Sequence, residues 1–564
     1  MLQKADGQSS ARQKPVLDFQ DHLAQLDAAG LLVKVDRPIN KDTELHPLVR
    51  WQFIGGIPED ERKAFIFTNV VDSKGRKYDI PVVLGALAAS ARIYAMGMGC
   101  AVSEIGDAWL AAIANPIPPR VVDSGPVHDV VITGDDLKKP GGGLARLPVP
   151  VSTPGFDSAP YLTATLCITK DPESGIHNMG MYRAALKATD RMVVRMGARP
   201  GGAGGWLHWL KARERGEKLP IAIALGAAPV VAFTSPQKLP VDLDEFAVAG
   251  GLAGDAIDVV KCRTIDLLVP ANAEIVIEGL IDPNVLEPEA PFGESNGYVA
   301  LEAFNMPMQV TAITHKKKPV FSAIISQVTP SESSAIKRVA YEPLFLNHLR
   351  NTMGIKGVKR VVLHEPLTNL RPVVFVQYEY GTSKAEIWRG LYGATSFLSG
   401  IGKITIAVSD DIDPTSVDAV LWSLAYRSRP AEDVHVLPYR NRVQGAHYGP
   451  NPTDSCLLID ATRKYPMPPL ALPARPFMEN SYRIWQELGL PPVKQTPPWH
   501  GYTLGDWSET WQRFADRTAA GDWEENGKET LARQRTGLEA ETSVKRVEGD
   551  PVQQEIAKAA RRTR

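Results

Sequence analysis

Cysteine is scarce in this chain, and its few copies form no metal-binding or disulfide-forming arrangement. The four cysteines, Cys100, Cys167, Cys262 and Cys456, lie far apart and include no C-x-x-C pair. This usage favours a reducing compartment and argues against both a disulfide framework and a zinc knuckle. We therefore expect a cytoplasmic protein.

Features of secreted, membrane and nucleic-acid-binding proteins are also missing. The N-terminal stretch MLQKADGQSSARQKP has no apolar segment of the kind that a secretion signal needs, and no apolar run is long enough to span a bilayer. The formal net charge is −1, so the chain has no basic excess with which to bind nucleic acid or an anionic membrane. We expect neither of these partners.

What the sequence does contain indicates a globular protein of several domains. Hydrophobic residues make up 44% of the chain and charged residues 23%, which is typical of folded soluble proteins. Its 564 residues exceed what one ordinary core accommodates, so about two to four domains are expected.

Hydrophobic periodicity predicts an α/β region first and a strand-rich region after it. Phe19, Leu23 and Leu26 share one helical face, and residues 31–35 follow as a strand. Between Tyr161 and about Gln327, β-branched segments predict an antiparallel sheet or barrel. These segments are 161–169, 273–281 and 308–314, with a turn at 315–319 and a return strand at 320–325.

A second α/β domain is predicted after a junction at 328–345. Its strands are expected at 357–363 and 371–380, and a helix is expected at 384–398, before the segment 404–414. A further helix carries Val417, Val420, Leu421 and Leu424 at helical spacing, with Asp413 and Thr415 as candidate caps. From about Pro476 the sequence becomes rich in Trp and charge, which predicts an arm that wraps a neighbour and then a disordered end.

Three motifs in the first two regions can be interpreted either as parts of a binding or catalytic site or as purely structural features. HNMGMYR, 177–183, offers an amide at Asn178 and a guanidinium at Arg183, but it also fits a surface strand end. RMGARPGGAGGW, 195–206, can hold a phosphate through backbone N–H groups, or it is a flexible loop, and it lacks the ending of a Walker A motif. In LDEFAVAGGLAG, 243–254, Glu245 is either a ligand or a residue that complements a helix dipole.

The fourth motif, LEPEAPFGESNGY at 286–298, places Glu289 and Glu294 on either side of an apolar turn. Two acids beside Phe292, with an arginine from elsewhere in the chain, predict a proton-transfer site. Two glutamates at this spacing more commonly lie in a solvent-exposed turn. Glu274 and Glu278, on the preceding strand, are expected to be solvated.

The order of these motifs is more specific than any one of them. N-x-G-x-Y-R, R-x-x-x-R-P-G-G, L-D-E-F-A-x-A-G, V-V-K-C (259–262) and E-A-P-F-G-E-x-x-G-Y together resemble the UbiD-type, prenylated-FMN-dependent decarboxylases. The resemblance extends from about residue 16 to 470 and includes DDIDP…VLWSLAYRSRP (410–430) and LLIDATRK (457–464).

The resemblance implies a multidomain α/β fold. Its parts would be an N-terminal α/β region (1–125), a central split β-barrel that binds the flavin (126–330), a C-terminal α/β oligomerisation domain (331–474) and a C-terminal arm with a polar tail (475–564). The implied reaction is reversible, non-oxidative decarboxylation of an aromatic, heteroaromatic or α,β-unsaturated acid. Loss of CO₂ from an sp² carbon needs an electron sink, which the prenylated flavin supplies in this family.

The family's site residues map onto this sequence by motif. The match makes Glu294 the proton donor, with Arg183 and Glu289 completing the network. The family also uses a divalent metal, usually manganese, with potassium nearby, and the matching oxygen ligands are Asn178 and Glu245. The cofactor contacts map onto Met181, Tyr182, Arg183, Arg195, Met196, Gly197, Arg199, Pro200 and Gly201.

One position departs from the family pattern. Arg199 stands where the third metal ligand is usually a histidine, and a protonated arginine has no lone pair to donate. Either Arg199 replaces part of the metal's charge at the phosphate, or another group completes the shell. His177 and His208 lie nearby in sequence but not at the matching position, so neither is assigned as a ligand.

Alternatives to the decarboxylase interpretation remain open. The enzyme can run as a carboxylase, the chain can be a non-catalytic flavin-binding member, or it can be a flavin reductase that NADH oxidation would reveal. The substrate can be a ring carboxylate, a hydroxylated benzoate, a heteroaromatic acid or a phthalate-type CoA thioester, and the polar loop candidates Ser331, Glu332 and His447 argue against the simplest cinnamate-like acid. A flavin prenyltransferase would supply the cofactor, and a homodimer or homohexamer is expected.

Overall fold

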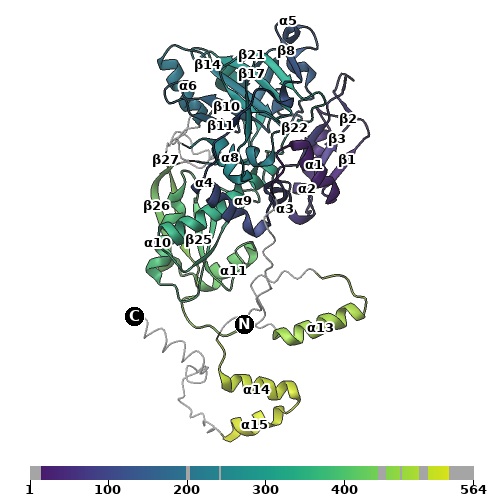
Figure 1. The fold of residues 1–564 in the computed structure, drawn as a ribbon. Coiled ribbons are helices and arrows are strands. Elements are labelled where there is room, and N and C mark those ends of the chain that lie inside the picture. Colours follow the sequence, from purple (N-terminus) through teal and green to yellow (C-terminus); the bar gives the residue numbers. More distant parts are fainter. Residues whose placement is uncertain are drawn as a thin grey trace.

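The computed structural model describes residues 14–197, 204–239, 243–441, 453–469, 473–493 and 506–532. Figure 1 shows an upper body built from the N-terminal and central segments and a lower body built from the C-terminal sheet. The helix α9 (Glu332–Asn347) lies where the two bodies meet. Among the helices in these ranges, none has both the length and the apolarity needed to cross a membrane.

The N-terminal segment folds as its periodicity predicts. The helix α1 (Phe19–Ala28) begins at Asp18, whose side chain accepts hydrogen bonds from the first free N–H groups, and it buries the predicted apolar face. The strand β1 (Leu32–Val35) follows and pairs in parallel with β3 (Ala64–Phe67). The sheet has the order β1-β3-β6-β22, with β6 at Val82–Leu84 and β22 at Phe321–Ser322.

The prediction of a return strand at 320–325 is wrong. The strand β22 does not pair back onto β21 (Ala303–His315) but runs parallel to β6, with Phe321 opposite Val82. At its C-terminal end, β21 is already paired on both sides, because His315 lies opposite Ile275 of one neighbour and Val130 of the other. No edge is left there for a hairpin, so the chain crosses to the N-terminal sheet instead.

The central segment forms a ten-stranded sheet, which confirms that this region is mainly strand. Its main path is β11-β10-β14-β17-β21-β13-β12-β9, and β8 and β18 also pair with β21. The predicted strand at 161–169 is divided into two. The bounds are β8 (Val130–Thr133), β9 (Tyr161–Leu162), β10 (Leu166–Lys170), β11 (His177–Gly180), β12 (Ala184–Ala188), β13 (Arg191–Val194), β14 (Leu219–Leu225), β17 (Ile275–Ile281) and β18 (Glu287–Glu289).

Helices and shorter strands complete the upper body. The helices are α2 (Leu45–Ile54), α3 (Ala91–Met98), α4 (Ile105–Ala114), α5 (Asp135–Lys138), α6 (Gly204–Glu214), α7 (Pro229–Thr234) and α8 (Glu245–Ala253). The shorter strands are β2 (Ile39–Asn40), β4 (Val70–Val71), β5 (Lys77–Tyr78), β7 (Arg120–Val121), β15 (Asp258–Lys261), β16 (Leu268–Pro270), β19 (Phe292–Gly293) and β20 (Val299–Ala300).

Glu274 and Glu278 are fully buried, so the prediction that they are solvated is wrong. Lys316 Nζ donates to Glu274 at 2.7 Å, and a backbone N–H and a glutamine amide also bond that carboxylate. Glu278 accepts from the backbone N–H groups of Arg263 and Thr264. Burial of these acids is tolerated because each carboxylate finds donors on segments distant in sequence.

The C-terminal segment forms a five-stranded sheet with the order β23-β24-β25-β27-β26. The predicted strands and helices are present, but the cap of α11 (Val417–Arg427) is Ser416, whose hydroxyl accepts from Ala419 N. Asp413 instead accepts from Thr415, so the two predicted caps bond each other. The bounds are β23 (Val358–Leu363), β24 (Val373–Tyr378), β25 (Ile404–Ser409), β26 (Val434–Asn441), β27 (Thr453–Asp460), α10 (Lys384–Phe397) and α12 (Pro430–Asp433).

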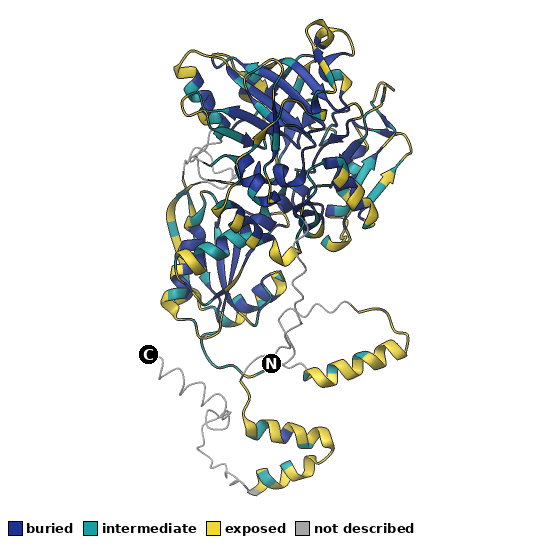
Figure 2. Ribbon diagram, viewed as in Figure 1, coloured by how far each residue is buried: buried dark blue, intermediate teal, exposed yellow. Residues whose placement is uncertain are grey.

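The helices in the described part of the arm are mostly exposed, and Figure 2 draws them largely in yellow. They are α13 (Arg475–Glu487), α14 (Glu509–Ala520) and α15 (Trp523–Ala532). None of the residues of α13 is buried, although Phe477 and Ile484 are apolar. That the arm wraps a neighbour stays a prediction.

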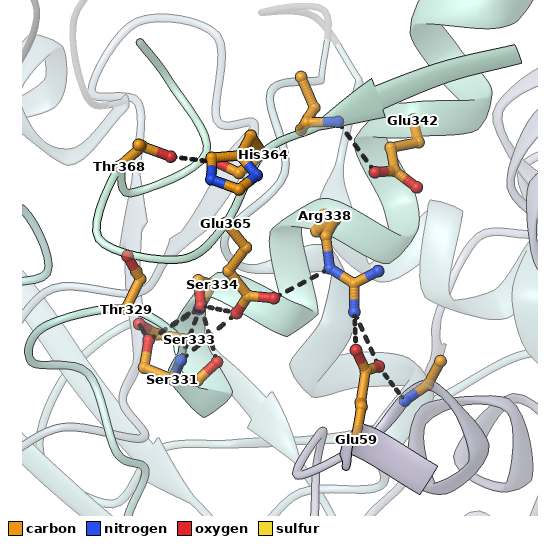
Figure 3. Close-up of polar contacts among 12 residues, drawn as sticks. Glu59, Thr329, Ser331, Ser333, Ser334, Arg338, Glu342, His364, Glu365 and Thr368 are labelled. Carbon is orange, nitrogen blue, oxygen red and sulfur yellow. Dashed lines mark hydrogen bonds and ion pairs between the residues drawn. The ribbon is translucent and has the colours of Figure 1, made fainter. Parts of the chain in front are cut away.

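The N-terminal half of α9 forms hydrogen bonds and ion pairs with both bodies, and Figure 3 shows these polar contacts. Arg338 donates to both oxygens of Glu59 in the N-terminal segment and to Glu365 in the C-terminal one. The Ser331 hydroxyl caps the helix, and the Glu332 carboxylate accepts backbone N–H groups of residues 85–88. Ser331 and Glu332 are both fully buried, so the prediction that they are polar loop residues suited to a substrate is wrong, and His447 lies outside the described residues.

Candidate active site

Two arginines are brought together by one hairpin. The antiparallel strands β12 and β13 pair Ala184 with Val194, so Arg183 and Arg195 lie at the adjacent ends of the two strands. The backbone N–H of Arg195 donates to the carbonyl of Arg183 at 3.0 Å. Register alone therefore places both guanidinium groups at one end of this hairpin.

The strand β21 brings Glu289 close to Arg183, because β21 pairs with both β13 and β18. Its Met306 lies opposite Val194, and its Ala303 lies opposite Glu289. Arg183 donates from Nε to Oε1 of Glu289 at 2.7 Å and from Nη2 to Oε2 at 2.9 Å. This is the bidentate geometry in which a guanidinium binds a carboxylate most strongly.

Glu294 lies in the turn between β19 and β20. Its backbone N–H donates to the Tyr298 carbonyl at 2.9 Å, which fixes the turn. Arg183 Nη1 and Arg195 Nη1 both donate to the same oxygen of Glu294, Oε1, the second at 2.7 Å. The guanidinium of Arg183 also lies 4.5 Å from the centre of the Phe292 ring. The structure therefore brings together the three residues predicted as catalytic and adds Arg195 to them.

The bend is held by residues that the sequence motifs did not reveal. The carboxylate of Asp157 accepts from Gly293 N at 2.9 Å, and the hydroxyl of Tyr161 accepts from Ala290 N at 3.2 Å. A side chain at Gly293 would meet Thr153 Oγ1 at 2.2 Å, so this close approach requires glycine. Asp157 and Tyr161 precede the bend by more than a hundred positions and carry no local signal, so only the fold identifies them.

Burial and ion pairing set the electrostatics of this cluster. Glu289 is fully buried, and the side chains of Arg183 and Glu294 are 9% and 16% exposed. Burial alone would lower the pKa of Arg183, but the hydrogen bonds and charges of Glu289 and Glu294 raise it above its ordinary value. Burial raises the pKa of the neighbouring Tyr161 to about 12, so this hydroxyl stays neutral.

Part of the predicted flavin cradle lies beside this cluster. Met181 and Tyr182 directly precede Arg183, and Met196 and Gly197 follow Arg195 on the opposite side of the hairpin. Arg199, Pro200 and Gly201, which are also predicted cofactor contacts, lie outside the described residues.

The beginning of α6 approaches this cradle closely. A Cβ added at Gly204 would lie 1.9 Å from Asn178 Oδ1, and one at Gly205 would lie 2.7 Å from Met196 Sδ. Gly205 N also donates to the Tyr182 hydroxyl at 3.4 Å. Backbone N–H groups at such a glycine-rich helix start suit a phosphate, so these residues fit a flavin nucleotide.

The predicted metal ligands are close to each other. Glu245 is the first residue of α8, and its Oε2 accepts from the backbone N–H of Met179, the residue after Asn178. Burial raises the pKa of Glu245 to about 8. This partly buried carboxyl forms no ion pair in the described part of the chain, and it fits a hard metal ion, which would supply the missing charge. Across the described ranges, no three His, Cys, Asp or Glu side chains group as a metal site, so the ligand set is incomplete there.

The neighbouring histidine His208 has a structural role. Its Nδ1 lies 2.8 Å from Thr169 Oγ1, and burial lowers its pKa to about 4, so the ring is neutral. This arrangement gives no reason to assign it as a metal ligand.

Comparison with known proteins agrees with this geometry. Residues 120–328 match the model of the 3-octaprenyl-4-hydroxybenzoate carboxy-lyase Rift-related domain, and residues 336–461 match the model of the C-terminal domain of the same enzyme. The two matches together cover more than half of the chain. The chain therefore belongs to the UbiD family, whose members are carboxy-lyases, as the motif order predicted.

Solved structures give the same family. The UbiD-class enzyme HmfF from Pelotomaculum thermopropionicum, in complex with FMN, is 29% identical with a TM-score of 0.70, over 82% of this chain and 96% of that one. An evolved dimeric form of HmfF, in complex with prFMN, has the same identity and TM-score over 81% and 97%. Sedimentibacter hydroxybenzoicus vanillic acid decarboxylase is 23% identical with a TM-score of 0.68, over 90% and 99%, which shows the shared fold. The mixed α/β fold class and the decarboxylase class are confirmed.

Proposed function

We propose that this protein uses prenylated FMN to decarboxylate an aromatic, heteroaromatic or α,β-unsaturated acid, with Glu294 as the proton donor. The observation that carries the proposal is the pair of contacts that Arg183 makes with Glu289 and Glu294. Bound prenylated FMN would supply the electron sink. The chain's own residues must then bind a carboxylate, exclude water and deliver one proton.

The pattern of hydrogen bonds supports Glu294 as the acid. Arg183 and Arg195 pair with Glu289 and Glu294, and Arg371 also interacts electrostatically with Glu294, so three cations interact with these two carboxylates. Both oxygens of Glu289 are bound by Arg183, whereas both arginine contacts of Glu294 reach Oε1. Oε2 of Glu294 is therefore the atom best suited to carry the proton.

The cofactor contacts extend this proposal. Met181, Tyr182, Arg195, Met196 and Gly197, together with the sequence matches Arg199, Pro200 and Gly201, would hold the flavin, and the phosphate would lie at the start of α6. Asn178 and Glu245 would hold a divalent metal, with manganese expected and potassium nearby. A flavin prenyltransferase would supply the cofactor in the cytoplasm, to a homodimer or homohexamer.

The test is to co-express the chain with a flavin prenyltransferase and to measure the mass of the released cofactor. CO₂ release is then measured for benzoate-type, heteroaromatic and cinnamate-type acids in D₂O. We expect prenylated FMN and one deuterium at the carbon that lost CO₂. Absence of prenylated FMN from the folded protein would contradict the proposal.

The same preparation tests the alternatives. Net fixation of ¹³C-bicarbonate under high CO₂ would identify carboxylation as a feasible direction. NADH oxidation without decarboxylation would instead support a flavin reductase. Bound prenylated FMN without turnover of any acid would support a non-catalytic member.

A further inference from the structure

A basic cavity lies in the upper body, away from the acid–arginine cluster. It has a volume of about 810 Å³ and is lined by the turn before β6, the glycine-rich segment after α5 and the turn after β21. Glu289 lies opposite Ala303, whereas the cavity reaches Ile313, ten residues further along the same strand. At about 3.3 Å per residue, this separation is roughly 30 Å. The cavity is therefore distinct from the proposed catalytic site.

Six cationic side chains line this cavity, in a chain whose net charge is only −1. They come from three segments far apart in sequence, and all six are exposed. One acid, Asp79, lines the same cavity. The six are Arg76, Lys77, Lys139, Arg146, Lys317 and Lys318.

Most of this positive charge is not neutralised by the protein. Lys139 pairs with Asp136, and Arg76 donates to the Gly141 carbonyl. In the described part of the chain, the remaining four side chains form no ion pair. Like charges that converge without counterions repel one another, so a bound anion would stabilise the arrangement.

The lining also has features suited to the rest of a ligand. Three consecutive glycines, 141–143, line the wall, and the exposed Gly141 leaves its backbone open to a ligand, whereas the space beside Gly142 and Gly143 is filled by the protein's own backbone. Tyr78 and Ile80, which are both partly exposed, add an aromatic ring and apolar surface. The volume lies within the range of small-molecule pockets, about 300–1,000 Å³, and is far larger than one phosphate ion needs.

We propose that this cavity binds a small organic polyanion of nucleotide size, with two or more phosphate groups and an apolar or aromatic part. Cations on three walls suit a ligand with several separated charges, and the apolar wall suits a ring. A partly open hollow of about 810 Å³ suits a small molecule better than an extended polymer or a membrane surface, which would contact a broader face. This binding is independent of the proposed decarboxylation.

The test uses flavin-loaded protein, so that the proposed phosphate site at α6 is already occupied. ADP is titrated calorimetrically, with adenosine and inorganic phosphate as probes of the two parts of the ligand. We expect ADP to bind, to bind more weakly as salt is raised, and to bind more tightly than either probe. Absence of ADP binding, or equal binding of inorganic phosphate, would overturn the proposal.

A triple variant locates the binding. Arg146→Gln, Lys317→Gln and Lys318→Gln together remove half of the cations, and we expect the dissociation constant of ADP to rise by about tenfold or more. The matched control, Lys218→Gln with Lys356→Gln, removes exposed cations elsewhere and should leave the dissociation constant unchanged. Unchanged ADP binding in the triple variant would overturn the proposal.

Photolabelling provides a second measurement that does not depend on the folding of the variant. An azido-ADP probe is crosslinked to the unaltered, flavin-loaded protein, and the labelled peptides are identified. Labels within 76–81, 139–147 or 313–320 would support the cavity, and labels confined to other segments would overturn it.

Discussion

Arg183 binds both oxygens of Glu289, whereas the arginine contacts of Glu294 reach only Oε1. A single substitution at Glu294 tests its proposed role as the proton donor. In Glu294→Gln the amide cannot deliver a proton, so decarboxylation should fall by about 10²–10⁴-fold while the flavin is retained. Turnover and flavin content are measured together. Glu287→Gln is the matched control, since Glu287 pairs with Arg191 at the edge of the same sheet and should be nearly silent. Full turnover by Glu294→Gln would contradict the assignment.

Arg183 is the second residue whose geometry makes a prediction. Lysine cannot reproduce the two parallel bonds to Glu289 and the third to Glu294, so Arg183→Lys should lower kcat/KM by about a hundredfold, or about 2.7 kcal/mol. Arg191→Lys, at the more exposed pair with Glu287, provides the comparison and should change kcat/KM by less than about threefold. Equal losses in the two variants would mean that the geometry at Arg183 has no special role.

At the scale of elements, the helix α2 carries His46, which is fully buried and has no hydrogen bond to either ring nitrogen within the described structure. Burial lowers its pKa from 6.5 to about 3. The unfolded chain therefore binds a proton that the folded chain does not. The stability contributed by the neutral ring is complete above pH 6.5 and is lost as the pH falls toward 3.

His46→Leu should therefore reduce the loss of stability between pH 6.5 and 4, by an amount of the order of 1–3 kcal/mol. Thermal midpoints across this range are measured for the variant, for the unaltered protein and for His435→Gln, which changes an exposed ring. An unchanged acid dependence in His46→Leu would show that this ring does not contribute.

The cap of α11 gives a prediction at the same scale. Ser416→Ala removes the hydroxyl that accepts from Ala419 N and should lower the stability of the C-terminal sheet by about 1 kcal/mol. Thr415→Ala removes only the side-chain contact with Asp413 and should cost less. Urea unfolding of the two variants, followed by a probe in the C-terminal segment, distinguishes them. A larger loss in Thr415→Ala would contradict the cap seen here.

For the whole molecule, Arg338 is one of the residues that join the two bodies (Figure 3). Arg338→Gln leaves Glu59 and Glu365 without their shared cation, and we expect a loss of about 2–3 kcal/mol after allowing for the partial exposure of Glu59. Calorimetry should show one melting transition separating into two. Arg360→Gln, at an exposed pair with Asp413, should leave the transition intact. A single, unshifted transition in Arg338→Gln would contradict the coupling.

The sequence predicted much of the fold from local patterns. The helix at Phe19 and the strands at 31–35 and 273–281 were found where periodicity placed them, because their core-facing residues recur with the period of the element. The predicted catalytic trio came from motif order, and its mutual contacts came from the structure. Asp157 and Tyr161, which hold the bend, have no motif and were not predicted.

By itself, the sequence determined several of the helices and strands, the family and the catalytic candidates Arg183, Glu289 and Glu294, because these depend on periodicity, turn residues and the order of motifs along the chain. Only the tertiary structure decided which strand accepts β22, why Glu274 and Glu278 can be buried, and that basic turns at 76–77, 139–146 and 317–318 meet around one cavity. Each of these depends on which distant edges and donors become neighbours when the sheets form. Such pairings are set by long-range hydrogen bonds and packing, which no local pattern contains.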